Sequence, residues 1–328
     1  MGGTRIWPQS GRRPVTAGNP MITGIPGRTG EQMFKITIRT RWLLVPLAAL
    51  GLAACGQAVS GSPAPNPEAA RQAADRTLDQ GVAAMGKYVQ TSANFRGTVF
   101  RYATIDDKGS GSEVEVSRMG QPAAVMTKIH STSHSGFDYD VFHPAGSALD
   151  YVRLGPGYAK LAPTKWVSMA AFSASDFSCA MPGLQTLCKL TDTIDATRKA
   201  APPGLSTETR RLDDGGTDIE TSITLKAFLD ATVIPIPADI TTRIDPDMTG
   251  KLIPVRLTLN SDGTFRRIEV NGAVLGKAGK VQLQVGYETK GPSASDDYPP
   301  VPQPAEVTAL PDKAAVDDFW ARLGQIRG

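Results

Sequence analysis

Residues 252–272, LIPVRLTLNSDGTFRRIEVNG, form two alternating runs of apolar and polar residues on either side of Asn260-Ser261-Asp262-Gly263. Alternation with a period of two is typical of a strand with one covered face. An Asp-Gly pair between two such runs is a strong hairpin signal. We therefore expect an antiparallel hairpin here, followed by another strand in the run KVQLQVGYET, residues 280–289.

The same period recurs upstream, between Phe95 and Trp166, in five short runs. They are FRGTVFRYATI (95–105), SEVEVSRMG (112–120), AAVMTKIHS (123–131), FDYDVFH (137–143) and LDYVRLGPGYAKLAPTKW (149–166). The breaks between them are short and carry Asp, Gly, Ser or Pro. This favours an antiparallel meander over βαβ units, with one covered and one wet face.

Helical patterns precede and interrupt these strands. Asn66-Pro67-Glu68 is typical of a helix start, and an apolar face recurs through residues 67–91 at Leu78, Val82, Met85 and Val89. After Trp166 we expect two short helices, in SMAAFSASDF (168–177) and PGLQTLCKLTDTIDATRKA (182–200). Strands return at 206–213 and 217–224, and LKAFLDA (225–231) predicts a further helical turn. The fold class is α+β.

The C-terminal part has a different composition. Six prolines between Gly291 and Pro311 predict an extended segment that wraps the surface or swings free. A last helix, at about 312–326, carries an apolar stripe of Val316, Phe319, Trp320, Leu323 and Ile326. This stripe either docks on the domain or contacts a partner. Asp312, Asp317 and Asp318 make an anionic bilayer an unfavourable target.

A short apolar run near the beginning sets the expected compartment. Trp42–Ala54 is too short to cross a bilayer, and Lys35, Arg39 and Arg41 precede it, as in a signal peptide. Leu52-Ala53-Ala54-Cys55 matches the lipobox of bacterial lipoproteins, in which the cysteine thiol is acylated and becomes the first mature residue. A plain secretory signal with a chance cysteine is the alternative. Residues 1–32 do not fit a signal and suggest a start codon set too early.

Charge excludes one class of partner. Of 35 basic and 32 acidic residues, 7 and 1 precede Cys55, so the chain from Cys55 onward has a net charge of about −3. Nothing in this balance favours nucleic acid. No second apolar run is long enough to span a membrane, so acyl chains on Cys55 would be the only anchor at the outer face of the cell membrane.

Cys179 and Cys188 are the other two cysteines. An exported compartment permits disulfides, and the short separation makes a structural bridge the favoured interpretation. A redox or metal pair is the alternative, but the spacing is not Cys-x-x-Cys and no histidine or third thiol is near in sequence.

Motifs that carry chemistry are missing from the sequence. It has no Gly-x-Ser-x-Gly, Ser-x-x-Lys, phosphate-loop or His-Glu-x-x-His pattern. The three histidines, His130, His134 and His143, could converge with Asp138 or Asp140 around a hairpin, but surface histidines are the plainer interpretation. We expect no catalytic residue, no metal and no cofactor.

The order of elements resembles the mycobacterial lipoproteins of the LppX/LprG type, which are related in fold to the carrier LolA. The resemblance covers about 67–290 and rests on Gly157-Tyr158-Ala159-Lys160-Leu161 with Trp166, on Asp214-Gly215 through Leu225, and on Asp262-Gly263 with Arg266 or Arg267. It implies a strongly curved antiparallel sheet, a half-barrel with helices over one face or mouth. It also implies an apolar cavity for the acyl chains of envelope lipids or lipoglycans.

These expectations define the predicted organisation and site. The predicted parts are a signal peptide (1–54), a flexible tether (55–66), a LolA-like domain (67–290), a proline-rich segment (291–311) and a C-terminal helix (312–328). The candidate cavity residues are Val99, Val114, Val116, Val125, Val141, Tyr151, Tyr158 and Trp166. Ordinary core packing is the alternative for each.

The predicted function is non-enzymatic carriage of lipid or lipoglycan within the envelope. The first alternative is an interaction or scaffold lipoprotein with the same fold and a filled core, which binds an envelope protein through the sheet edge or the last helix. The second is a hydrolase with an unrecognised site.

Overall fold

In the computed structural model of the protein, the hairpin at 252–272 is formed by β9 (Leu252–Leu259) and β10 (Phe265–Leu275). Gly263 closes the turn with φ +80°, a conformation that favours glycine. The Asp262 side chain accepts hydrogen bonds from the backbone and the hydroxyl of Thr264. The next strand is β11 (Lys280–Thr289), as predicted.

The structure describes residues 66–327 except 107, 133, 172–178, 180, 182, 235, 237–240, 242–243 and 278. All of them belong to one unit, Gly61–Gly328. The predicted signal peptide, the lipidation site Cys55 and the tether up to residue 65 lie outside the described residues. Among the residues described, no helix is both long enough and apolar enough to cross a membrane.

The long first helix begins and ends where the sequence predicts. α1 (Pro67–Thr91) starts at Asn66, whose side chain accepts hydrogen bonds from the backbone of Glu68 and Ala69. This cap satisfies amides that have no partner within the helix. The buried face of α1 carries Leu78, Met85 and Val89.

A single 12-stranded sheet dominates the unit, in the order β12-β6-β5-β4-β3-β2-β1-β11-β10-β9-β8-β7. Its neighbours are antiparallel except β12 and β6. The remaining strands are β1 (Asn94–Ile105), β2 (Lys108–Met119), β3 (Ala124–Ser131), β4 (Tyr139–His143), β5 (Leu149–Leu154), β6 (Trp166–Ala170), β7 (Glu208–Arg211), β8 (Thr217–Thr224) and β12 (Val307–Ala309).

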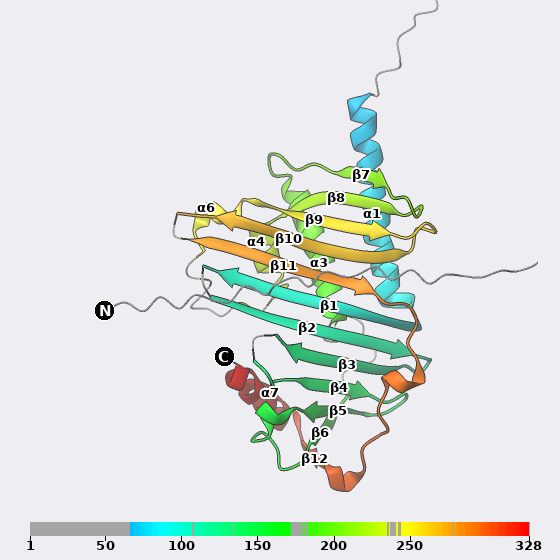
Figure 1. Ribbon diagram of the computed structural model, residues 1–328, viewed down its shortest axis with the longest axis vertical. Coiled ribbons are helices and arrows are strands. Elements are labelled where there is room, and N and C mark those ends of the chain that lie inside the picture. Colours follow the sequence, from blue (N-terminus) through cyan, green and yellow to red (C-terminus); the bar gives the residue numbers. More distant parts are fainter. Residues whose placement is uncertain are drawn as a thin grey trace, which may run out of the picture. The chain divides into compact units, whose positions relative to one another are not determined.

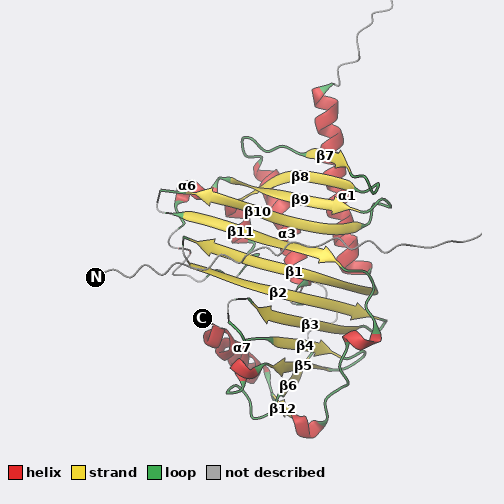
Figure 2. Cartoon of the chain, in the orientation of Figure 1, coloured by secondary structure: helices red, strands yellow, loops and turns green. Residues whose placement is uncertain are grey.

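Helices cover one face of this sheet, which we call the inner face (Figure 1). α1, α3 (Leu184–Ala200) and α4 (Leu225–Asp230) lie there, and the short helix α6 (Pro246–Thr249) packs beside α4. The opposite face, here the outer face, is uncovered over β7 to β11 (Figure 2). The α+β class and the antiparallel meander are therefore confirmed.

The prediction of a strongly curved half-barrel is not confirmed. The sheet is open, with β7 and β12 at separate edges, and it is not strongly curled (Figure 2). Strong curvature is usually introduced by bulges. Within the described ladders, the one register shift lies between β9 and β10, at Phe265 and Arg267.

Two local predictions between Leu149 and Ala171 were wrong, and part of a third segment lies outside the described residues. Ser168–Ala170, assigned to a helix, belongs to strand β6, and residues 172–178 are not described. Pro156–Tyr158 forms the short 3-10 helix η1 and not part of a strand. The second predicted helix is present as α3.

The proline-rich segment wraps the unit. It contains the 3-10 helices η2 (Ser295–Asp297) and η3 (Pro304–Glu306), and it adds β12 to the sheet edge beside β6. The Ser293 hydroxyl donates a hydrogen bond to the Arg118 carbonyl, which holds the proline-rich segment against β2. The last helix, α7 (Lys313–Arg327), buries Phe319 and Leu323 in the hydrophobic core. The docked alternative for its apolar stripe is thus the one observed, and of the five stripe residues only Ile326 is largely exposed.

Candidate functional site

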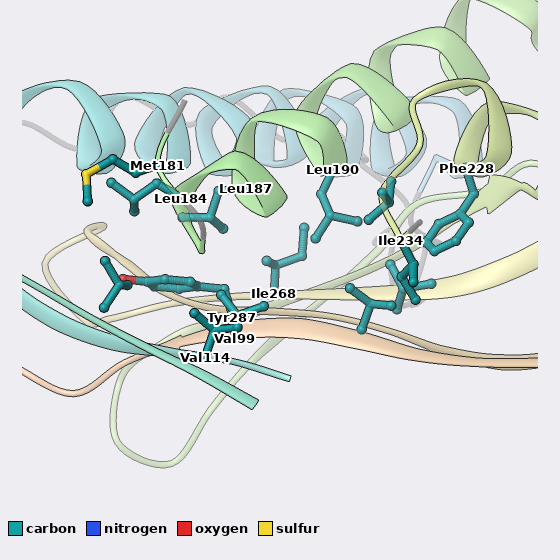
Figure 3. Close-up of a cluster of buried hydrophobic side chains, with 14 of the residues drawn as sticks. Val99, Val114, Met181, Leu184, Leu187, Leu190, Phe228, Ile234, Ile268 and Tyr287 are labelled. Carbon is teal, nitrogen blue, oxygen red and sulfur yellow. The ribbon is translucent and has the colours of Figure 1, made fainter. Parts of the chain in front are cut away.

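The inner face carries one uninterrupted apolar row across nine neighbouring strands. Register pairs connect its members from β8 to β5: Ile219, Leu257, Ile268, Tyr287, Val99, Val114, Ile129, Tyr139 and Leu154. Eight of these side chains are buried and Tyr139 is partly buried. Figure 3 shows Leu184, Leu187 and Leu190 above the labelled part of this row. The apolar layer between helices and sheet is the candidate lipid site.

The eight candidate cavity residues do not all face this layer. Val99, Val114, Val116, Val125, Val141 and Tyr158 are buried members of the core. Tyr151 and Trp166 are only partly buried. Tyr151 alternates with Val152, whose register partner is Val141, so Tyr151 points to the outer face. Trp166 pairs with Arg153, which is also on the outer face.

The start of α3 lies directly on strand β2. An added Cβ on Gly183 would meet Val116 at 3.4 Å and Val114 at 3.6 Å, which is ordinary contact distance. Gly183 has φ +98°, a conformation that an L side chain rarely adopts. The structure also contains the disulfide between Cys179 and Cys188, which ties the chain before α3 to the helix itself. In this conformation the backbone of Gly183 lies close above Val114 and Val116, with room for about one added carbon.

Two basic side chains border the layer. Arg101 of β1 donates a hydrogen bond of 2.8 Å to the Thr186 hydroxyl of α3. Lys189, one turn further along, donates to the Thr232 carbonyl. Burial lowers the pKa of Lys189 below its ordinary value, and the nearby charge of Arg101 lowers it further. Two cationic side chains therefore adjoin the apolar layer.

A pair of tyrosines marks the opposite margin of the layer. The Tyr88 and Tyr287 hydroxyls lie 2.8 Å apart, among the rings of Phe95 and Phe265. Burial raises the pKa of both phenols. Tyr287 occupies the space above Gly97, where an added Cβ would lie 2.0 Å from its hydroxyl. Both hydroxyls therefore stay protonated, and the two rings contribute to the packing of the core.

The outer face of the same strands is charged. Asp218 is buried, with a side chain 2 % exposed, and accepts hydrogen bonds from Arg256, Arg210 and Thr258. Burial alone would raise the pKa of Asp218, but these three donors outweigh it and hold that pKa below its usual value. Arg267 pairs with Glu269, and Lys290 pairs with Glu288. These charged side chains offer no apolar surface for acyl chains.

Three pockets formed by described residues stand out, and none of these three is lined by a candidate cavity residue. Two lie over the charged outer face, with volumes of about 430 and 390 Å³, and both include Arg256 and Glu269. The third, of about 610 Å³, lies at the ends of β3, β4 and β5 and is closed by the loop Gly155–Lys165. No sequence pattern predicted this pocket, because residues from three separate strands and the loop after β5 build it.

The histidines are separated. His143 Nδ1 lies 2.8 Å from the Asp150 carboxylate on the inner face, whereas His130 lies 3.9 Å from Asp138 at the strand ends. Across the described part of the chain, no three His, Cys, Asp or Glu side chains come close enough to hold a metal ion.

Comparison with known proteins assigns no family. No protein-family model matches the chain, and no curated protein matches it. MucB, solved in complex with MucA(peri), is similar at 13% identity over 68% of this chain and 58% of that chain, with a TM-score of 0.26. A DUF1329 family protein from Desulfovibrio piger is similar at 8% identity over 69% of this chain and 97% of that one, with a TM-score of 0.24.

These likenesses are too distant to carry an argument about ligand or activity. The chain spans 58% of the MucB chain to which it is similar. The resemblance to LppX/LprG-type lipoproteins rests on the sequence and stays a prediction.

Proposed function

We propose that this chain is a non-enzymatic lipoprotein, anchored through Cys55 at the outer face of the cell membrane, that binds acyl chains of lipids or lipoglycans and carries them within the envelope. The observation that supports this function is the apolar row across nine strands of the inner face, part of which α1, α3 and α4 cover. Such a surface provides binding by burial, at about 0.8 kcal/mol per methylene removed from water.

Entry of an acyl chain requires α3 to move away from β2. A Cβ added to Gly183 would already be in contact with Val114 and Val116, so an acyl chain placed there displaces the start of the helix. The disulfide keeps Cys179 with α3 during that movement. Arg101 and Lys189 adjoin the layer, so an anionic headgroup at this position would lie beside two cationic side chains.

The experiment is mass spectrometry of the protein purified from an envelope-bearing host, under native conditions and after organic extraction. Wild type is expected to hold about one diacyl lipid per chain beyond any acyl group on Cys55. Val114→Trp, which fills the space under α3, is expected to reduce the bound lipid at least tenfold. Leu275→Trp is the matched control, because Leu275 is 63% exposed and this variant should keep wild-type occupancy. Trace lipid, equal in all three proteins, would contradict the proposal.

A second candidate function is an anchored interaction module with the same fold and a filled core. It is favoured by the burial of Val99, Val114 and Val116, each 0% exposed. In that case the partner would bind outside the apolar layer. The lipid occupancy of wild type separates the two candidates.

A further inference from the structure

The pocket of about 610 Å³ at the ends of β3, β4 and β5 is bounded on one side by a well-fixed loop, Gly155–Lys165. Its volume is in the usual range for small-ligand sites. The loop that closes it is fixed by two backbone hydrogen bonds of 2.9 Å, from Gly155 to the Asp138 carbonyl and from Gly157 to the Gly136 carbonyl. An added Cβ on Gly155 would lie 2.4 Å from the Asp138 carbonyl oxygen, so only glycine permits this approach.

The C-terminal segment braces the same wall. Thr164, in the loop, shares a hydrogen bond of 2.6 Å with Thr308 of β12. Tyr139, which lines the pocket, packs against Trp320 of α7 with ring centroids 6.0 Å apart. Figure 1 shows η1, the turn within this loop, beside α7. The tail, which the sequence resemblance left without a role, therefore supports the pocket.

The polar lining holds a buried carboxylate. Asp140 has a side chain only 6% exposed, and it forms an ion pair with Arg153, whose side chain is 43% exposed. Oδ2 of Asp140 is the oxygen that meets the Arg153 guanidinium. A carboxylate oxygen can accept more than one donor, so Asp140 keeps acceptor capacity beside a pocket lined by a guanidinium donor. His130 and Asp138 lie on another part of the lining.

The charges of the lining balance. Asp138 and Asp140 are matched by Arg153 and Lys165. An inorganic anion would be repelled by the two carboxylates, and a metal cation would be repelled by Arg153, which already pairs with Asp140. An acyl chain would desolvate four charged groups. The remaining wall is apolar and formed by Leu154, Pro156, Ala159, Ala162 and Pro163.

We infer that this pocket is a binding site for an uncharged saccharide. Sugar hydroxyls both donate and accept, so a vicinal pair can donate to Asp140 and accept from Arg153, while the apolar face of the ring packs on the Pro156 and Ala162 wall. This site adjoins the end of the proposed acyl layer, because Tyr139 and Leu154 belong to both, but the inference does not depend on acyl binding.

Saturation-transfer NMR with the full-length protein tests this inference. The probes are D-glucose, D-galactose, D-mannose and maltose, with inorganic phosphate as the charged probe. At least one sugar is expected to receive saturation from the protein and to be displaced by another sugar but not by phosphate. No transfer to any of the four sugars, or displacement by equimolar phosphate, would overturn the inference.

Two variants locate the binding. Ala162→Trp places a ring into the pocket from a half-buried wall position, and it is expected to weaken sugar binding at least tenfold without changing the thermal midpoint. Arg153→Lys keeps the charge but loses the planar donor pair, so it is expected to weaken binding several-fold. Glu208→Gln, in the lining of a different pocket, is the matched control and should bind as wild type. Sugar binding that is equal in all these proteins would overturn the assignment to this pocket.

Discussion

The two faces of the sheet are made by alternate residues of the same strands, yet they are held together in different ways. On the inner face, Leu257, Ile268 and Tyr287 are neighbours in one dry row beneath α1 and α3. One residue along on the outer face, Arg256 pairs in register with Glu269, and both side chains line pockets. The inner face depends on shape and volume, whereas the outer face depends on charge pairs that water can partly replace.

The first prediction concerns the inner face and has the largest expected effect. Leu187→Ala removes a side chain that is 0% exposed between α3 and the sheet. The lost burial and the remaining cavity are expected to lower the free energy of unfolding by about 2–5 kcal/mol. Urea unfolding, monitored by circular dichroism, measures the change. A loss below about 0.5 kcal/mol would show that α3 is not packed on the sheet as described.

The second prediction adds volume to the same face. Gly97→Ala would place a Cβ 2.0 Å from the Tyr287 hydroxyl, so Tyr287 must shift and its contact with Tyr88 must change. We expect a loss of about 1–3 kcal/mol. The matched control is Gly86→Ala, because Gly86 has nothing within 4 Å of an added Cβ and lies within α1. That control is expected to be neutral or stabilising, as alanine is the better helix former.

The third prediction moves to the outer face and depends on pH. Asp218→Asn keeps the shape of the side chain but removes the charge that Arg256 and Arg210 share. At neutral pH we expect a loss of about 1–2 kcal/mol, the lower part of the range for hydrogen bonds to charged groups, because both arginines are half-exposed.

The sign of its pH dependence follows from the lowered pKa of Asp218. The stabilisation is present above the unfolded value, 3.8, and disappears as the pH falls through the lower folded value. The difference between wild type and Asp218→Asn should therefore be constant above about pH 5 and shrink below 3.8. A difference that grows on acidification would contradict the ion-pair geometry.

The fourth prediction has the smallest effect. Leu275→Ser changes a side chain at the end of β10 that is 63% exposed, so the free energy of unfolding should change by less than about 0.5 kcal/mol. The same urea titration measures it. A larger loss would show that this end of β10 is covered by another surface.

Local signals in the sequence predicted much of the fold. The cap at Asn66, the turn at Gly263 and the alternation in β2 depend on neighbours in the chain, and each was found where expected. The strand β6 was assigned to a helix beyond Trp166 because Ser168, Met169 and Ala170 have no clear period of two. Its strand conformation is fixed by pairing with β5 and β12 on either side.

The candidate sites were harder to predict than the fold. The apolar row joins single residues from nine strands, so only the register brings Val99 beside Tyr287 and Val114 beside Ile129. Tyr151 and Trp166 were expected among the cavity residues, but strand alternation places them on the outer face. The pocket around Asp140 and Arg153 depends on contacts between a loop and the tail, which no local pattern encodes.

Photocrosslinking with a phospholipid that carries a diazirine near the end of one acyl chain tests the central claim, that acyl chains bind between α3 and the inner face. The proposal predicts crosslinks to peptides that contain Val114, Val116 or Leu187, and their loss in Val114→Trp. Crosslinks confined to peptides of the outer face, unchanged in that variant, would contradict it.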